Sequence, residues 1–380
     1  MKKHLLAVLI LISIIMVTLF KSITDLYVSV SVSNLSDLYV SNSLLIPTSP
    51  CNCSRPLPPR GNDLSKALMN GTIPPDGSYV GHSSCNLYTD HLGSGQDVLS
   101  YSYYTPHTIN IPEDRHWFRY LGLVEDLLKT MVSLYPGWRM RIYHNVTTNQ
   151  ADELAFLCKL YCEYSYLDLC DVRQTPSIVD HADLEDTVDM GRAWRFVVLG
   201  DPTVRMFGVR DLDSYLLERE RDVVRDWVRS GDQFYVMRDT PIGRNSAGYF
   251  MPIKGGCWGG NNYKDFPLAK SLAMNDVKTR SIINPGYWDI YKKEYFCMYF
   301  DMVYLREILW PVIRKGSACY DSYHCEAVSE LGQSLPFPTK RQGGLYVGAG
   351  PIKYNLISEM AKHICPKVCR PRYHKDWLYC

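Results

Sequence analysis

Two aspartates separated by one residue, Asp211 and Asp213, are the residues of this sequence best suited to chemistry. They follow the apolar run 204–210 and precede a dense charged segment, in the stretch FGVRDLDSYLLERERD. On an extended chain residues i and i+2 share a face, so we expect the two carboxylates to project together. Adjacent carboxylates repel each other unless a cation or strong donors neutralise them. The pair therefore suits a hard divalent ion, Mg²⁺ or Mn²⁺, whose remaining ligands include phosphate oxygens.

Two other uses of the pair stay open at the level of the sequence. The aspartates could form ion pairs with the nearby cations Arg210, Arg219 and Arg221, or they could simply face solvent. A D-x-D alone is common, and its place directly behind an apolar strand is what favours the metal. Ser214, the next residue, is predicted to cap the helix that follows.

Short strands and helices alternate from about residue 98 onward, and these elements must position the pair. Apolar runs predict strands over 98–104, 138–145, 167–172, 204–210 and 233–239, and helical spacing predicts helices over 116–135, 150–164, 191–201 and 216–228. This alternation predicts an α/β domain with a mainly parallel central sheet. Ligands of such sheets bind at the carboxyl ends of the strands, which is where the aspartates lie.

The N-terminus predicts a membrane anchor. MKKH precedes the uncharged run Leu5–Phe20, which at 16 residues is short for a spanning helix of about 20. No good small-x-small cleavage site follows, which favours a signal anchor over residues 1–21 rather than a cleaved signal peptide. The lysines ahead of the run predict a type II orientation, with the remaining chain outside the cytosol. Residues 22–97, rich in Ser, Pro, Asn and Gly, are predicted to form a luminal stem, and residues 98–380 the folded domain.

Sequons and cysteines agree with a luminal location. Four N-x-S/T sequons occur, at Asn34, Asn52, Asn70 and Asn145. In an oxidising compartment the 13 cysteines predict disulfides, with one cysteine left over. The tail spacing C-x3-C-x4-H-x5-C, over residues 365–380, is close to that of a zinc knuckle, but disulfides are the simpler use in a lumen.

The composition argues against a nucleic-acid scaffold. The formal net charge of the 380 residues is +1, and no block of five or six like charges occurs. Binding to a phosphate backbone needs a concentrated basic surface, which such a balance does not supply. The 46% hydrophobic content is enough for a sizeable core.

The wider sequence around the pair resembles a glycosyltransferase-like family of the GT-A type, the nucleotide-diphospho-sugar transferase fold. The likeness rests on RDLDSYLLERERDVVRDWVRSGDQFYVMRDTP, then GGCWGG, then PFPTKRQGGLYVG, with YPGWRMRIYHN and GRAWRFVVLGDP upstream. It covers about residues 98–350. The resemblance implies a GT-A-like mixed, mainly parallel sheet flanked by helices, and transfer of a sugar from a nucleotide-diphosphate donor.

The resemblance also implies how the donor is held. Asp211 and Asp213 would bind Mn²⁺ or Mg²⁺ and, through the ion, the diphosphate of the nucleotide sugar. Arg210 would lie beside that site as a donor-binding residue. Arg219 and Glu220 would form a supporting pair.

Two further segments gain roles from the same resemblance. Asp239, after the next strand, would face the acceptor and act as a base. The loop that contains Gly255, Gly256, Trp258 and Gly259 would approach the sugar closely, and the indole would stack on it. The alternative for this loop is an ordinary turn with a tryptophan in the core.

The chain departs from the family pattern at several places. Thr240 stands where a histidine usually follows M-R-D, and Asp301 is followed by Met in place of Gln. The late H-D-S is Y-D-S here, so a histidine ligand is missing and Asp321 or His324 would have to substitute, with Asp321 as a second catalytic candidate.

The favoured function is a metal-dependent glycosyltransferase of the Golgi or ER membrane, with a glycan, protein or lipid as acceptor. The departures leave a non-catalytic sugar-binding relative of the fold as an alternative. A D-x-D phosphatase of the haloacid-dehalogenase type is a weaker one, because Tyr215 stands where that class has Thr or Val.

Overall fold

A computed structural model of the protein describes residues 53–61, 82–104, 113–175, 191–241, 251–273, 300–326, 334–351 and 354–380. All of these belong to one compact unit, which begins at Cys53. The predicted anchor, Leu5–Phe20, and the sequons at Asn34, Asn52 and Asn70 lie outside the described residues. Within the ranges given above, no helix is both long and apolar enough to cross a membrane.

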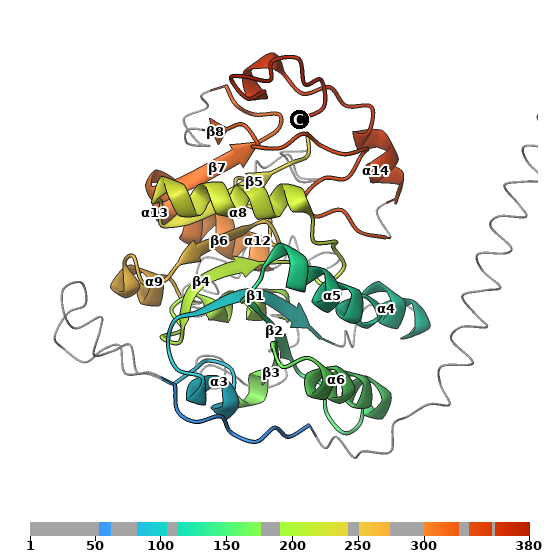
Figure 1. Ribbon diagram of the computed structural model, residues 1–380, viewed down its shortest axis with the longest axis vertical. Coiled ribbons are helices and arrows are strands. Elements are labelled where there is room, and N and C mark those ends of the chain that lie inside the picture. The colour runs from blue at the N-terminus through green and yellow to red at the C-terminus, as the bar shows by residue number, and fades with distance from the viewer. Residues whose placement is uncertain are drawn as a thin grey trace, which may run out of the picture. The chain divides into compact units, whose positions relative to one another are not determined.

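One eight-stranded sheet runs through this unit, in the order β3-β2-β1-β4-β6-β5-β7-β8. Figure 1 shows the strands in this order from bottom to top. Every neighbouring pair is parallel except the two pairs that involve β6, which runs antiparallel to β4 and β5. The predicted α/β class with a mainly parallel sheet is therefore confirmed. The strands are β1 (Gln96–Tyr103), β2 (Arg139–His144), β3 (Leu167–Asp171), β4 (Val204–Val209), β5 (Phe234–Arg238), β6 (Trp258–Asn261), β7 (Ser317–Asp321) and β8 (Ser334–Leu335).

Helices bury both faces of the sheet. Successive residues of a strand point to opposite faces, so in β5 Phe234 and Val236 enter one apolar cluster while Tyr235 and Met237 enter the other. The second cluster is covered by α5 (Val124–Leu134), α6 (Ala151–Glu163) and α8 (Glu218–Ser230). The first is covered by the 3₁₀ helix η3 (Gly191–Val198), α9 (Phe266–Leu272), and the run of α12 (Phe300–Val303), the π-helix η5 (Tyr304–Leu309) and α13 (Trp310–Ile313).

The remaining described helices are short. They are α3 (Leu87–His91), α4 (Glu113–Arg119), α14 (Tyr354–Met360) and the 3₁₀ turns η1 (Leu121–Leu123), η2 (Val172–Gln174), η6 (Arg314–Gly316) and η8 (Lys367–Cys369).

Several predicted elements differ in detail. The helix expected over 116–135 is divided into α4, η1 and α5, and Gly122 at the division is a weak helix former. The segment 191–201 forms a 3₁₀ helix rather than an α-helix. Ser214 does not cap the next helix, because α8 begins at Glu218 with Leu217 as its N-cap residue. The second half of GGCWGG is strand β6, not a loop.

Disulfides tie the segment predicted as a stem to the sheet domain. Cys53 is bonded to Cys158 of α6, and Cys85 is bonded to Cys170 of β3. Arg55 adds a non-covalent contact, since its guanidinium lies 3.6 Å from the centre of the Tyr161 ring. Residues 53–61 and 82–97 therefore belong to the folded unit, which begins well before the boundary expected at residue 98.

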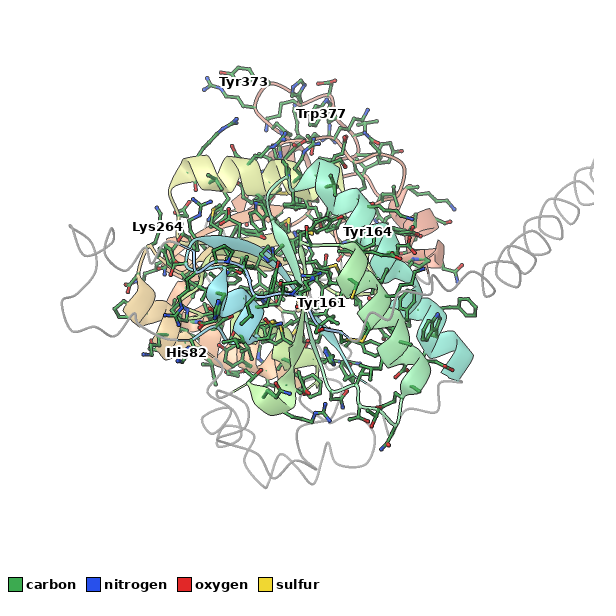
Figure 2. All side chains as sticks on the ribbon, turned by 60° about the horizontal axis from the view of Figure 1, so that its bottom comes forward. His82, Tyr161, Tyr164, Lys264, Tyr373 and Trp377 are labelled. Atoms are coloured by element: carbon green, nitrogen blue, oxygen red, sulfur yellow. A yellow bond between two sulfur atoms is a disulfide. The ribbon has the colours of Figure 1, made fainter. Side chains whose placement is uncertain are left out.

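The C-terminal segment is also closed by disulfides, which join Cys325 to Cys369 and Cys365 to Cys380. The prediction of disulfides is confirmed for these four pairs, and the bonded sulfurs exclude a zinc knuckle in the tail. His374, the candidate zinc ligand there, instead stacks on Trp377 with the ring centres 4.1 Å apart. Figure 2 shows Trp377 and the exposed Tyr373 at the tip of this segment.

Candidate functional site

The candidate site lies where the order of the strands reverses. The chain places β2 and β3 on one side of β1, and β4 with all later strands on the other side. Ligands of open α/β sheets bind at such a switch point, outside the carboxyl ends of the strands. Asp211 and Asp213 follow β4 directly, and the amide of Arg210 donates to the carbonyl oxygen of Ser100 in β1 at 3.0 Å. The pair is therefore held at the edge where this fold class binds ligands.

The aspartates lie in a tight turn, residues 211–214, and not on an extended strand. The amide of Ser214 donates to the carbonyl oxygen of Asp211 at 3.2 Å, which closes the turn. The expected i, i+2 geometry of a strand is therefore wrong, although both side chains leave the same turn. The side chain of Asp211 is 35% exposed and that of Asp213 is 7% exposed, so solvent reaches Asp211 far more readily.

Each aspartate contacts an arginine that the sequence did not indicate. Arg119 Nη2 lies 2.9 Å from Asp213 Oδ2, and Arg195 pairs with Asp211 Oδ1. The alternative of ion pairing is thus realised, but by other cations. The arginines considered from the sequence pair elsewhere: Arg210 with Glu220, Arg219 with Asp239 and Arg221 with Asp222.

Arg195 is fixed by β1 and bridges two carboxylates. Its amide donates to Ser102 Oγ at 2.9 Å, and its carbonyl oxygen accepts from Ser100 Oγ at 2.7 Å. Its guanidinium reaches Asp211 on one side and Asp301 Oδ2, at 3.3 Å, on the other. Burial raises the pKa of Asp301 above its usual value, although the charge of Arg195 acts in the opposite direction.

The charges around the turn balance each other. Arg192, which donates from Nε to the Tyr104 hydroxyl at 2.9 Å, adds a third cation that acts on Asp301. Three carboxylates and three guanidiniums are therefore gathered there: Asp211, Asp213, Asp301, Arg119, Arg192 and Arg195. A divalent cation added to this group would give it a net positive charge, which would favour an anionic ligand.

Two glycines press the loop before β6 against these carboxylates. Because β6 is antiparallel to β4, the loop that precedes it begins at the edge where β4 ends. A Cβ on Gly256 would lie 2.6 Å from both the amide nitrogen and Oδ2 of Asp211, and one on Gly255 would lie 2.8 Å from Asp301 Oδ2. The structure thus brings Gly255 and Gly256 beside Asp211, and only glycine allows the approach.

Trp258 does not line this site. It is fully buried in β6, opposite Val209, and its ring centre lies 5.5 Å from those of Phe196 and Phe207 in edge-to-face contacts. The alternative of a core tryptophan holds, and the expected stacking on a sugar is wrong. Gly259, next in β6, allows the close pairing of β6 with β4, since a Cβ there would lie 2.1 Å from the carbonyl oxygen of Phe207.

Arg210 is buried, so it is not available to bind the nucleotide-sugar donor as expected. Its Nε lies 3.2 Å from Glu220 Oε2, and its Nη1 donates to the carbonyl oxygen of Gly256 at 3.3 Å. Burial raises the pKa of Glu220, while the charge of Arg210 opposes the rise. Arg210 therefore holds the loop at Gly256 through a hydrogen bond. Glu220 pairs with Arg210, and not with Arg219 as expected.

Asp239, at the end of β5, is fully buried and saturated with donors. Arg219 donates to it from Nε and Nη2 at 2.9 and 3.0 Å, Arg341 from Nη2 at 2.5 Å, Ser322 from Oγ at 2.5 Å, and the amide of Val347 at 2.9 Å. Burial acts to raise the pKa of Asp239, but the two arginines outweigh it and the pKa lies below its usual value. This carboxylate joins four segments of the chain and does not face an acceptor.

Asp321, at the end of β7, is buried in a similar way. Arg238 Nε lies 2.7 Å from its Oδ2, and the amides of Tyr323 and His324 donate to its Oδ1 at 2.8 and 2.7 Å. Its carboxylate also lies close to the sulfurs of Cys325 and Cys369, a grouping that could suit a metal ion. Those two sulfurs are bonded to each other, so the group does not fit an ion.

A segment near the C-terminus, residues 341–350, crosses the turn, and we call it the strap. The amide of Tyr215 donates to the carbonyl oxygen of Ala349 at 2.8 Å, and Ser214 Oγ donates to that of Gly348 at 3.2 Å. Tyr346 of the strap is 4% exposed. Burial, together with the nearby Cys257 and Asp213, raises the pKa of the Tyr346 hydroxyl to about 12.

The sequence indicated some residues of the site and missed others. Arg195 belongs to GRAWRFVVLGDP, a stretch that carries the family resemblance, but nothing in it pointed to a carboxylate partner. Arg119 lies within a predicted amphipathic helix, where a cation normally faces solvent, and Tyr346 lies in the uninformative stretch GLYVGAG. Asn145, the sequon that the structure describes, is half-buried directly after β2.

Comparisons with known proteins add no relative. No protein-family model matches the chain, and no curated protein matches it significantly. The functional conclusion therefore depends on the site itself and on the resemblance seen in the motifs.

Proposed function

We propose that this chain is a metal-dependent glycosyltransferase that takes a sugar from a nucleotide-diphosphate donor at the turn 211–214. The observation that carries the proposal is the placement of Asp211 and Asp213 at the carboxyl end of β4, where the strand order reverses. The mixed, mainly parallel sheet agrees with the GT-A-like fold that the motifs imply.

The residues at the turn fit a divalent ion such as Mn²⁺ or Mg²⁺. Asp211 and Asp213 offer the hard carboxylate oxygens that these ions prefer. The backbone at Gly256 lies directly against Asp211, so close that a Cβ on it would be 2.6 Å from Oδ2. When bound, the ion would supply positive charge that stabilises the departing diphosphate.

The arginines of the site have a second task in this proposal. Arg195 and Arg119 hold the two carboxylates in place through ion pairs. When the carboxylates turn toward the ion, the guanidiniums become able to donate to phosphate oxygens, which they bind in a fork geometry. Arg192, held by the Tyr104 hydroxyl, adds charge at the same edge. The side chains would thus exchange a carboxylate partner for a phosphate partner as the donor enters.

Calorimetric titration of Mn²⁺ and a panel of nucleoside diphosphates tests the proposal. We expect wild type to bind both, and Asp211→Asn and Asp213→Asn to bind Mn²⁺ at least about 10-fold more weakly while keeping the fold, because each loses one anionic ligand. Melting curves of all three proteins provide the control. Wild type that binds neither ion nor nucleotide, or variants that bind as well as wild type, would refute the role of the turn.

A non-catalytic sugar-binding protein is the second candidate, and one observation favours it. Asp239 and Asp321, the two carboxylates expected to act in catalysis, are both buried and committed to arginines. Binding of Mn²⁺ and nucleotide without turnover of any nucleotide sugar would select this candidate. A phospho-enzyme at Asp211, lost in Asp211→Asn, would select the phosphatase.

We also propose that the protein acts in the lumen of the Golgi or ER, anchored by Leu5–Phe20, on a glycan, protein or lipid acceptor. The disulfides support an oxidising compartment, because such bonds are rare in cytosolic proteins.

A further inference from the structure

The C-terminal segment, residues 361–380, concentrates positive charge. It holds five Lys and Arg residues against one acidic residue, Asp376, although the formal net charge of the whole chain is only +1. The five cations are Lys362, Lys367, Arg370, Arg372 and Lys375. Among the residues that the structure describes, none of the five pairs with a carboxylate, whereas arginines of the sheet domain commonly do, as Arg219 does with Asp239. Uncompensated charges of one sign create a potential that attracts anions.

Covalent and hydrogen bonds hold these cations in a fixed arrangement. The two disulfides of the segment close it and tie it to the end of β7. Arg370 donates from Nη1 to the carbonyl oxygen of Lys375 at 2.8 Å and from Nη2 to that of Cys365 at 3.0 Å. Lys375 Nζ in turn lies 3.3 Å from the carbonyl oxygen of Lys367. Because carbonyl oxygens are neutral, these contacts fix the side chains without cancelling their charge.

Aromatic rings lie among the cations. Tyr373 is 84% exposed, and the guanidinium of Arg372 lies 5.6 Å from the centre of its ring. Trp377 stacks on His374 with the ring centres 4.1 Å apart, and Figure 2 shows Tyr373 and Trp377 at the same tip of the molecule. A ring as exposed as that of Tyr373 adds little to a core. Its face is available to pack on a ligand that has both apolar and polar surfaces, as a sugar does.

We infer that residues 361–380 bind an anionic glycan, whose sulfate or carboxylate groups pair with the cations while a sugar ring packs on Tyr373. Guanidinium and ammonium groups form their strongest hydrogen bonds with such oxyanions. Clusters of Lys and Arg on a surface are typical of heparin-binding patches. The inference goes beyond the proposed function and does not depend on the ion site at the turn 211–214.

Other occupants fit this surface less well. Ile364, Val368 and Leu378 are also exposed, but they alternate along the chain with the cations. A segment that lies in a bilayer surface instead separates an apolar face from a cationic one. A second copy of the chain would bring like charges together. Lysine, which supplies three of the five cations, is depleted at the cores of protein interfaces.

Calorimetric titration of full-length protein in neutral detergent tests this inference. The probes are a heparin-derived oligosaccharide, the same oligosaccharide without its sulfates, and detergent micelles that contain phosphatidylserine. We expect the sulfated oligosaccharide to bind at least about 10-fold more tightly than the desulfated one, because it offers more anions to the cations. Its binding should weaken as salt is added, since salt screens exposed charges.

Two variants separate the charges from the ring. Lys367→Gln combined with Arg372→Gln should weaken binding of the sulfated oligosaccharide about 10-fold, because two charge contacts are lost. Tyr373→Ala should weaken it about 2–10-fold through loss of the ring. Neither variant should lower the melting temperature, because all three side chains are exposed.

Arg314→Gln combined with Lys315→Gln is the matched control. Both side chains are exposed in η6, before β7, whereas the C-terminal segment is tied to the chain after β7. This control should bind the oligosaccharide like wild type. If the variant at Lys367 and Arg372 also binds like wild type, or if the control loses as much affinity, the inference is overturned while the proposed function stands. Tighter binding to the phosphatidylserine micelles than to the oligosaccharide would identify a membrane-binding surface and would also overturn it.

Discussion

Arg195 neutralises two carboxylates at once, because its almost fully buried guanidinium contacts both Asp211 and Asp301. Removing one member of a buried ion pair typically destabilises a protein by about 3–5 kcal/mol, since the partner charges stay buried. We therefore expect Arg195→Met to lower the free energy of unfolding by about that amount, measured by urea denaturation.

Arg205→Met is the control for this variant, since Arg205 is 47% exposed and pairs with Asp97 at the surface, where a loss of under about 1 kcal/mol is expected. Mn²⁺ should stabilise Arg195→Met more than wild type, because the ion replaces the missing positive charge between the carboxylates. Equal stabilisation of both proteins by Mn²⁺ would place the ion away from Asp211.

The lowered pKa of Asp239 predicts that the protein loses stability at acidic pH. Its folded pKa lies below the usual value, so its stabilising contribution is complete above the unfolded pKa of about 3.9 and is lost as the pH falls through the lower folded pKa. We expect Asp239→Asn to be less stable by about 3–5 kcal/mol at neutral pH, because Arg219 and Arg341 lose their buried partner.

The pH dependence separates this role from that of a base. Wild type should melt at lower temperature as the pH falls from about 5 to about 3, and Asp239→Asn should show a shallower decline over the same window. If Asp239→Asn had unchanged stability but no transfer activity, Asp239 would instead be a catalytic base.

At the scale of elements, the antiparallel strand β6 explains why the glycine loop reaches the acidic turn. Gly256 and Gly259 should therefore differ in what their substitution damages. In Gly256→Ala the new Cβ would lie 2.6 Å from Asp211 Oδ2, so we expect Mn²⁺ binding to be lost with about 1–3 kcal/mol of destabilisation.

In Gly259→Ala the Cβ would lie 2.1 Å from the carbonyl oxygen of Phe207, inside the sheet, so a loss of about 4 kcal/mol or more is expected. Melting curves and Mn²⁺ titration of the two variants check the contrast. Similar affinity for Mn²⁺ in Gly256→Ala and wild type would show that the loop does not border the ion.

The local pattern of the sequence was enough to predict most parallel strands and the α/β class. β2, β3, β4 and β5 fall within predicted strands and β1 begins two residues before its own, because apolar runs between helices have few other uses. β6 was not predicted, since WGGN has neither an apolar run nor β-branched residues and becomes a strand only by pairing between β4 and β5.

The same limit applies to the site. The turn was placed correctly at the end of a strand, because Asp211 and Asp213 come two and four residues after the last residue of β4. Arg119 and Arg195 reach it from other elements, and their partners depend on tertiary packing that no local spacing encodes. Asp239 and Asp321 were expected to act in catalysis and are instead buried, because the arginines that neutralise them are contributed by helix α8, the strap and β5.

At the scale of the whole molecule, the predicted anchor and sequons give a test of location. The protein should stay in membranes after an alkaline carbonate wash and should shrink on treatment with an N-glycosidase, because Leu5–Phe20 would span the bilayer and the sequons would face the lumen. Release into the soluble fraction, or unchanged mobility, would contradict the luminal assignment.

The cysteine pattern gives a second test of the whole chain. Peptide mapping of unreduced protein should recover the pairs Cys53–Cys158, Cys85–Cys170, Cys325–Cys369 and Cys365–Cys380. Cys257 and Cys319 are free and buried, so they should react with an alkylating reagent only after unfolding. Extensive alkylation of native protein would show that the disulfides do not form.

The bond from Cys53 to Cys158 sets an order of events during synthesis. The two cysteines are 105 residues apart, and Cys85, whose own partner is Cys170, lies between them. At roughly 5–20 residues per second a ribosome needs about 5–20 s to make that stretch. For this time the thiols of Cys53 and Cys85 emerge without their native partners and can bond to each other. Maturation in the proposed lumen should therefore depend on a disulfide isomerase, and formation of the four pairs should slow when that enzyme is depleted.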